Sequence, residues 1–60
     1  MKTENEILEE YRAEFENACD DLYYGYGYKF WRKTCRKSMS EEEAKIVWKA
    51  AFNNMAKCLS

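Results

Sequence analysis

Aromatic and basic side chains are concentrated in residues 22–37, LYYGYGYKFWRKTCRK, the part of the sequence best suited to bind a partner. The segment holds six of the ten aromatic residues and five of the ten basic ones. Aromatic rings stack on nucleobases and cations neutralise phosphates, so this mixture can bind nucleic acid. Tyrosine and arginine also carry much of the binding energy at protein interfaces. The plainest alternative puts Tyr28 and Trp31 in the core and leaves the lysines as a solvated face.

We predict that the partner-binding surface consists of aromatic side chains of this segment, as anchors, and its basic side chains, as a rim. They are Tyr24, Tyr26, Lys29, Phe30, Arg32, Lys33, Arg36 and Lys37. Another protein is the expected partner, because the chain has a net charge of −1 and its acidic N-terminal part would repel a polyanion. Nucleic acid is the alternative partner.

Catalysis is not expected, because the residue types that it needs are missing. The sequence has no histidine, the commonest general base and the commonest metal ligand. The one candidate nucleophile is Cys35, whose basic neighbours would lower the pKa of an exposed thiol. Helical periodicity instead turns Cys35 inward with Trp31. We therefore expect a protein that is not an enzyme.

The three cysteines, Cys19, Cys35 and Cys58, predict neither a disulfide framework nor a metal site, because they are odd in number and widely spaced. Buried reduced cysteines behave as small apolar residues, and their use indicates a reducing compartment, the cytoplasm. No cofactor is expected. The acidic N-terminus lacks an apolar segment, so we expect neither a secretory leader nor a membrane span.

Charge is distributed unevenly along the chain. Residues 1–21 carry eight acids and two bases, a net charge of −6, whereas residues 22–38 carry five bases and no acid. The acids expected on the solvated back of a first helix are Glu6, Glu9, Glu10, Glu14, Glu16, Asp20 and Asp21. The two parts can pair within the molecule or across a dimer, or present different surfaces to partners.

Three helices are predicted, over residues 4–24, 28–38 and 41–59. Apolar residues of the first recur at spacings of three and four: Leu8, Tyr11, Phe15, Ala18 and Leu22. The apolar stripe of the third is broader: Ala44, Val47, Trp48, Ala51, Phe52, Met55, Cys58 and Leu59. Trp48 lies at the centre of this stripe and is expected in the core, whereas Ile46 points away from it.

The helix ends carry recognisable signals. Thr3 with Glu6, and Ser40 with Glu43, form the capping-box pattern that begins a helix. One of the two glycines is expected to supply the left-handed residue that ends the first helix. These signals and the absence of proline predict an all-α fold, a small three-helix domain over residues 1–60. A helical hairpin that dimerises into a four-helix bundle is the alternative.

The segment 39–60, MSEEEAKIVWKAAFNNMAKCLS, resembles the last core helix of the Hha/YmoA nucleoid-modulator family. The pattern EFENA…KFWR…VWKAAF is similar to that of short early-region proteins of bacteriophages. Both resemblances imply a small helical protein that binds a larger bacterial protein. The expected function is thus that of a non-catalytic modulator or inhibitor, phage-encoded and directed at a host defence or gene-expression protein. The alternatives are a nucleic-acid-binding module that uses residues 23–37 and a structural, self-associating bundle.

Overall fold

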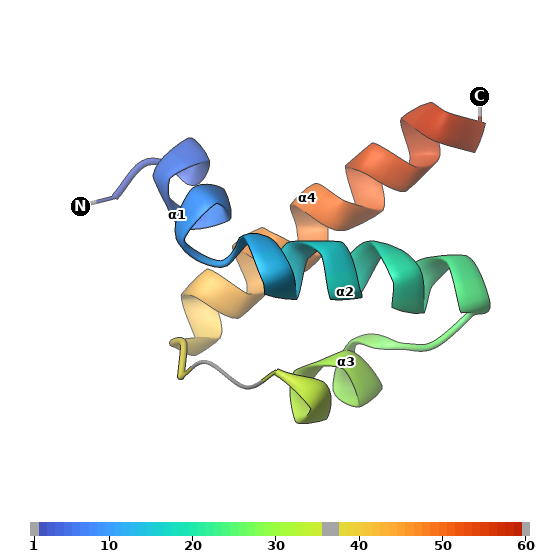
Figure 1. Ribbon diagram of the computed structural model, residues 1–60, viewed down its shortest axis with the longest axis horizontal. Coiled ribbons are helices and arrows are strands. Elements are labelled where there is room, and N and C mark those ends of the chain that lie inside the picture. Colours follow the sequence, from blue (N-terminus) through green and yellow to red (C-terminus); the bar gives the residue numbers. More distant parts are fainter. Residues whose placement is uncertain (1, 36–37, 60) are drawn as a thin grey trace.

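The computed structural model describes residues 2–35 and 38–59 and, of residues 58 and 59, the backbone only. Its described residues form four helices and no strand: α1 (Glu4–Glu10), α2 (Arg12–Tyr24), α3 (Tyr28–Thr34) and α4 (Glu41–Leu59). The predicted small all-α domain is therefore confirmed. The most extensive contact is between α2 and α4, while α3 folds back beside α2 and α1 contacts α4 (Figure 1).

The first helix, predicted as one element over residues 4–24, is divided at Tyr11 into α1 and α2. Tyr11 has φ −111° and ψ 39°, outside the helical range, although its amide still donates to the Ile7 carbonyl. Because α2 crosses α4 at an angle, a straight extension of α2 would carry the preceding helical turns away from α4 (Figure 1). The bend instead brings α1 back to α4, and Ile7 is buried.

Both predicted capping boxes are present. The Glu6 amide donates to the Thr3 hydroxyl at 3.3 Å, and the Thr3 amide donates to the Glu6 carboxylate at 3.4 Å. At the start of α4 the corresponding distances between Ser40 and Glu43 are 3.2 Å and 3.1 Å. The hydrogen bond from the Ser40 amide also holds the pKa of the Glu43 carboxyl below its usual value. Each pair satisfies two backbone donors that a helix terminus leaves without partners.

Gly25 is the predicted glycine that ends the longer N-terminal helix. Its φ of 87° is left-handed, a conformation that residues with a Cβ rarely adopt. The amide of Tyr26 donates to the Asp21 carbonyl at 2.7 Å, and the amide of Gly25 donates to the Leu22 carbonyl at 3.2 Å. This pair of bonds is a Schellman arrangement, and it reverses the chain so that α3 returns along α2.

The second predicted helix, over residues 28–38, ends earlier, because α3 stops at Thr34 and Cys35 is extended, with ψ 125°. The Thr34 hydroxyl donates to the Trp31 carbonyl at 2.8 Å, which satisfies one acceptor of the last turn. Arg32 donates to the Met39 carbonyl at 2.7 Å and fixes the approach to α4. An extended Cys35 lets the chain bring Met39 into the core, where it is buried.

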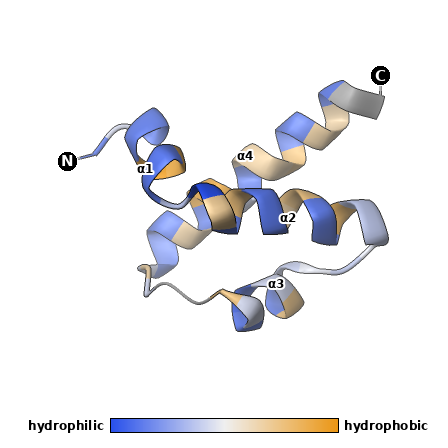
Figure 2. Ribbon diagram, viewed as in Figure 1, coloured by the Kyte–Doolittle hydropathy of each residue, from blue (hydrophilic) through white to orange (hydrophobic). Residues whose placement is uncertain are grey.

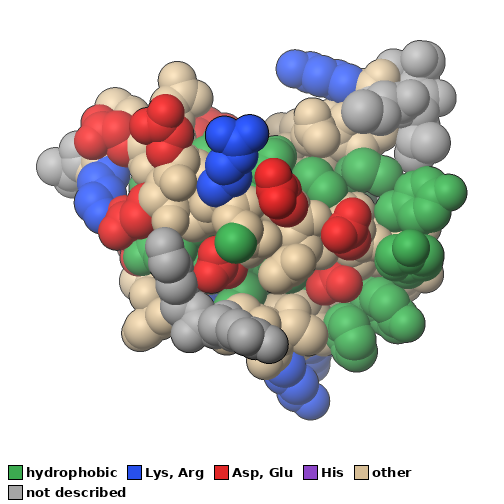
Figure 3. Space-filling view, in the orientation of Figure 1, with side chains coloured by type: hydrophobic (Ala, Val, Ile, Leu, Met, Phe, Trp, Pro, Cys, Tyr) green, Lys and Arg blue, Asp and Glu red, His purple; other side chains and the backbone are tan. Residues whose placement is uncertain are grey.

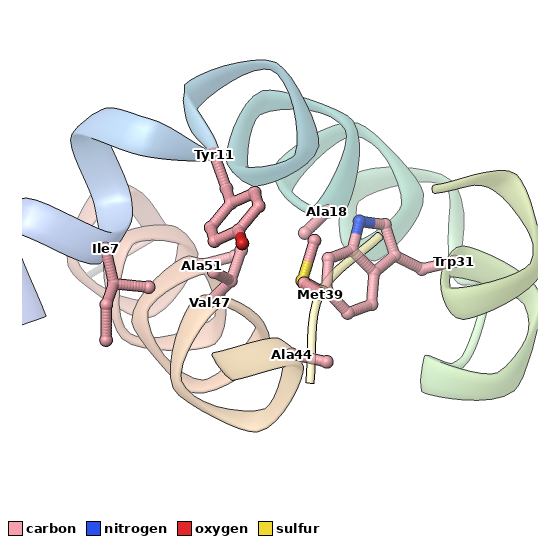
Figure 4. Close-up of a cluster of buried hydrophobic side chains, with 8 residues drawn as sticks. All are labelled: Ile7, Tyr11, Ala18, Trp31, Met39, Ala44, Val47 and Ala51. Atoms are coloured by element: carbon pink, nitrogen blue, oxygen red, sulfur yellow. The ribbon is translucent and has the colours of Figure 1, made fainter. Parts of the chain in front are cut away.

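The core lies where α2, α3 and α4 meet. Its buried apolar residues are Ile7, Tyr11, Ala18, Trp31, Met39, Ala44, Val47 and Ala51 (Figure 4). The indole of Trp31 has no exposed surface, and its N–H donates to the Glu14 carbonyl at 2.9 Å. Small residues on α2 and α4, Ala18 and Ala44, leave the space that this ring fills (Figure 4). Trp31 thereby anchors α3 to both long helices.

Trp48, expected at the centre of the core, lies at its edge and is half-buried. Its ring centroid is 5.4 Å from that of Trp31 and 5.8 Å from that of Tyr28. The central position is taken by Trp31. This residue belongs to α3, so the apolar spacing within α4 could not indicate that it would lie there. Ile46, expected to point away from the stripe, is also half-buried against the core, because α1 bends over α4 and covers part of that side.

The acidic back of the first predicted helix is not wholly solvated. Hydrophilic residues follow the near side of α2, with hydrophobic ones where it meets α4 (Figure 2). Glu14, however, is 4 % exposed and Asp21 is half-buried, because the face of α2 that they occupy is covered by the rest of the fold. Glu14 Oε2 and Asp21 Oδ2 are buried, and neither has a hydrogen-bond partner among the described residues. The prediction that both carboxylates lie in solvent is therefore wrong.

Replacing Asp21 with asparagine is expected to stabilise the domain at pH 7 by about 0.3–1 kcal/mol. The substitution removes a negative charge that is partly buried and that lies near a helix C-terminus, where negative charge is unfavourable. Burial, and secondarily the charge of Asp20, raise the pKa of the Asp21 carboxyl above its ordinary value of 3.8. The folded state then binds this proton more tightly than the unfolded chain. The free energy of unfolding therefore falls as pH rises from the ordinary pKa of the unfolded chain through the raised pKa of the folded state.

Thermal melts of Asp21→Asn and the parent at pH 7 and pH 3 test this expectation. The variant should melt higher at pH 7 and equally at pH 3, where both states hold the proton. Glu16→Gln, which removes an exposed acid of the same helix, is the control. An equal gain at both values of pH would contradict the assignment to Asp21 ionisation.

Candidate protein-binding surface

Large apolar side chains that remain exposed in the described part of the chain come from neighbouring positions at one end of the fold. Their exposed fractions are 72 % for Tyr23, 71 % for Tyr24, 47 % for Tyr26, 46 % for Phe30 and 58 % for Phe52. We call these five residues the aromatic surface. Hydrophobic side chains gather at the end of the molecule where α2 stops, next to acidic ones (Figure 3). Contiguous apolar surface of this kind marks interaction sites in soluble proteins.

An apolar groove opens between the C-terminal parts of α2 and α4. It has a volume of about 350 Å³ and is lined by Leu22, Tyr23, Phe52, Met55 and Ala56. The groove exists because the two helices diverge beyond their crossing (Figure 1). None of the described side chains that line it is charged, so it is suited to an apolar side chain rather than to an ion or a polar substrate.

Ring contacts hold the aromatic surface in shape. The rings of Tyr26 and Phe30 are stacked, with centroids 4.2 Å apart and planes 17° from parallel. Tyr23 and Tyr24 meet edge to face at 5.3 Å. The left-handed Gly25 sets the turn between these two pairs. Side chains that are already fixed lose less conformational entropy when they bind, so they serve well as anchors.

The structure leaves three of the predicted partner-binding residues exposed, Tyr24, Tyr26 and Phe30, and it stacks the last two on each other. Lys29 and Lys33 are exposed on α3. Arg32 is half-buried and already bonded to the Met39 carbonyl, so its guanidinium supports the fold. The remaining two predicted residues, Arg36 and Lys37, lie outside the described residues.

Sequence reasoning missed the α4 side of this site. Phe52 and Met55 belong to the apolar stripe of the third predicted helix, and both were expected in the core with Leu22. Phe52 is instead 58 % exposed and lines the groove with the other two. The breadth of that stripe was the available signal, because it exceeds what a single neighbouring helix can cover.

Cys35 has the opposite character to a reactive thiol. It is half-buried, and its Sγ–H donates to the Trp31 carbonyl at 3.4 Å. Burial raises the pKa of this thiol, and the opposing charge of Arg32 does not reverse the shift. Cys35 and Cys19 are both thiols, whereas the side chain of Cys58 lies outside the described residues.

Alkylation by iodoacetamide at pH 7.5 is therefore expected to be slower at Cys35 than at the thiol of glutathione, because little thiolate forms. Peptide mapping by mass spectrometry would give the rate at each cysteine separately. A urea-unfolded sample is the control, in which Cys35 should react at the rate of an ordinary thiol. Fast alkylation of Cys35 in the folded protein would contradict the burial argument.

Scans against protein-family models, curated proteins and solved structures found no match to the chain. Among the described residues, no helix combines the length and apolar character needed to cross a membrane. The same part of the chain contains no cluster of three or more acidic or cysteine side chains arranged to hold a metal ion. The aromatic surface and its groove are thus the features on which a functional proposal can rest.

Proposed function

We propose that this protein is a non-catalytic binding module of the cytoplasm, which modulates or inhibits a larger protein by docking its aromatic surface onto it. The observation that carries the proposal is the exposure of five large aromatic side chains, two of which, Tyr23 and Phe52, line an apolar groove. A chain of 60 residues has few apolar residues for its core. Leaving large aromatic side chains in water therefore lowers the stability of the fold. Interfaces are enriched in such residues.

A protein partner fits the charges around this surface better than a nucleic acid does. Of the basic residues described on α3, Arg32 is engaged with the backbone, which leaves Lys29 and Lys33 exposed. Tyr26 and Phe30 stack on each other, so one face of each ring is unavailable to a base. The net charge of −1 adds no long-range attraction for phosphates.

Affinity capture, followed by calorimetric measurement of the dissociation constant, tests the proposal. Immobilised parent protein would be compared with a Tyr24→Ser/Phe52→Ser variant and with a Lys29→Ala/Lys33→Ala variant in bacterial lysate. Proteins that bind the parent and the lysine variant, but not the aromatic variant, would be purified and titrated by calorimetry. We expect at least about tenfold weaker binding for the aromatic variant. The lysine variant should change mainly the association rate and its salt dependence.

A nucleic-acid function would show a different pattern. Gel shifts with random duplex and single-stranded DNA and RNA at low salt are expected to show no binding at tens of micromolar. Micromolar binding that falls with salt and is abolished by Lys29→Glu/Lys33→Glu would overturn the proposal, because phosphate contacts would then dominate.

A further inference from the structure

The aromatic surface carries a hollow and a projection next to each other. The hollow is the α2–α4 groove, one wall of which is Tyr23. The projection is Tyr24, which is 71 % exposed and whose ring touches that of Tyr23 at 5.3 Å. A two-fold axis that passes between a hollow and a projection brings the projection of each copy into the hollow of the other. The surface is therefore able to fit itself.

We propose that the chain forms a two-fold symmetric dimer in which the Tyr24 ring of each copy enters the α2–α4 groove of the other. The proposal rests on the proposed function, that the aromatic surface binds protein. It names a second copy of this chain as the occupant of the surface when no larger partner is bound. Since dimer and partner use the same residues, they exclude each other, and the larger partner binds the monomer.

The exposed area suits a reversible dimer. Taken together, the exposed fractions of the five residues amount to about three whole aromatic side chains. At roughly 150–250 Å² each, they offer about 450–750 Å² per copy, or about 900–1,500 Å² in the dimer. This range overlaps only the lower end of the roughly 1,200–2,000 Å² of specific interfaces. We therefore expect a dissociation constant in the micromolar range rather than an obligate dimer.

Charge and size also permit the pairing. The net charge of −1 produces little repulsion between copies. Near the aromatic surface, Asp20 is exposed one turn before Tyr23 and Tyr24, and Lys33 is exposed one turn after Phe30. A surface flanked by both signs can face itself, whereas flanks of a single sign would repel. Chains of this size commonly gain the burial that they lack by oligomerising.

Sedimentation velocity and native mass spectrometry over about 1–500 µM test the dimer. The parent should move from the 7.2 kDa monomer to twice that mass as concentration rises. Tyr24→Ser removes the projection and Phe52→Ser removes part of the hollow, and each should raise the dissociation constant at least about tenfold. Lys45→Ser, exposed on the N-terminal half of α4, is the control and should dimerise like the parent. Circular dichroism checks that each variant is folded, and Tyr23→Ser replaces Phe52→Ser if that variant is not.

Mixing the two variants gives the decisive result. A symmetric dimer has two contacts in which a Tyr24 ring enters a groove. In the heterodimer of Tyr24→Ser with Phe52→Ser, one of these contacts carries both changes, and the other joins an intact Tyr24 to an intact groove. The mixture should therefore form a heterodimer at concentrations at which each variant alone is monomeric, and the different masses of the variants identify it. Reciprocal insertion predicts this recovery. On a generally sticky surface every pairing would carry two substitutions, so the heterodimer would be weakened about as much as the two homodimers.

Several outcomes would overturn the dimer. They are a parent that stays monomeric at 500 µM, association into open-ended oligomers, variants that dimerise like the parent, and a mixture that recovers no heterodimer. The proposed function fails differently. A protein captured through the aromatic surface by a parent that stays monomeric would support the function and reject the dimer. A dimer with recovery, whose surface captures no other protein, would support the dimer and reject the modulator.

Discussion

Replacing Trp31 with alanine should cost about 3–5 kcal/mol of folding free energy, the range seen when a large aromatic is removed from a core. A domain of 60 residues has roughly 3–9 kcal/mol in total, so this loss removes at least about a third of its stability. The effect is large because Trp31 is completely buried and its N–H bond to the Glu14 carbonyl is the anchor of α3 on α2. Its loss also removes the hydrogen bond that the indole adds to that carbonyl.

Far-UV circular dichroism with urea titration measures this effect. Phe30→Ala, the adjacent position on the same helix, is the matched control, because Phe30 is 46 % exposed and should cost far less. Trp31→Phe separates the two contributions, since it keeps most of the packing and removes the hydrogen bond, worth about 1 kcal/mol. A Trp31→Ala protein that melts within a few degrees of the parent would show that α3 is not held by this ring.

Replacing Ala18 with leucine should destabilise the domain by about 1–3 kcal/mol through overpacking. Ala18 is completely buried on α2, and the residues of α4 that share its core, Val47 and Ala51, are completely buried as well. The added carbons have no space unless α2 moves away from α4, the most extensive contact of the fold. This substitution therefore tests whether the small residue sets the distance between the two long helices.

Ala13→Leu on the same helix is the control, because Ala13 is exposed and leucine has a similar helix propensity. It should leave the urea midpoint nearly unchanged. Equal midpoints for Ala18→Leu and the parent would mean that α2 and α4 are loosely packed at this point, contrary to the complete burial of Ala18.

Local signals were the ones that sequence reasoning interpreted correctly. The Thr3–Glu6 and Ser40–Glu43 boxes and the glycine that ends the first long helix involve residues at most five positions apart, so their partners are visible in the sequence. The all-α class follows from the same short-range pattern. The sequence also placed Tyr24, Tyr26 and Phe30 outside the core, and all three are exposed, whereas their binding of a partner stays a prediction.

Tertiary packing decided the features that sequence reasoning missed. The bend at Tyr11 depends on the angle between α2 and α4, which no periodicity within residues 4–24 encodes. Trp31, and not Trp48, fills the centre of the core because α3 returns along α2. Glu14 of α2 is buried by this packing as well. Phe52 is exposed because α2 and α4 diverge beyond their crossing. Each of these outcomes depends on how the helices pack against one another. Knowing which residues are helical is not sufficient to predict it.

The bend at Tyr11 makes α1 a separate unit of local unfolding. Its seven residues are too few to stay helical alone, and its one buried side chain is that of Ile7. Detaching α1 would expose little of the core, whereas detaching α2 would expose the Trp31 site and the whole contact with α4. The amide hydrogens of α1 should therefore exchange with solvent through brief openings of this segment alone, while α2, α3 and α4 remain folded.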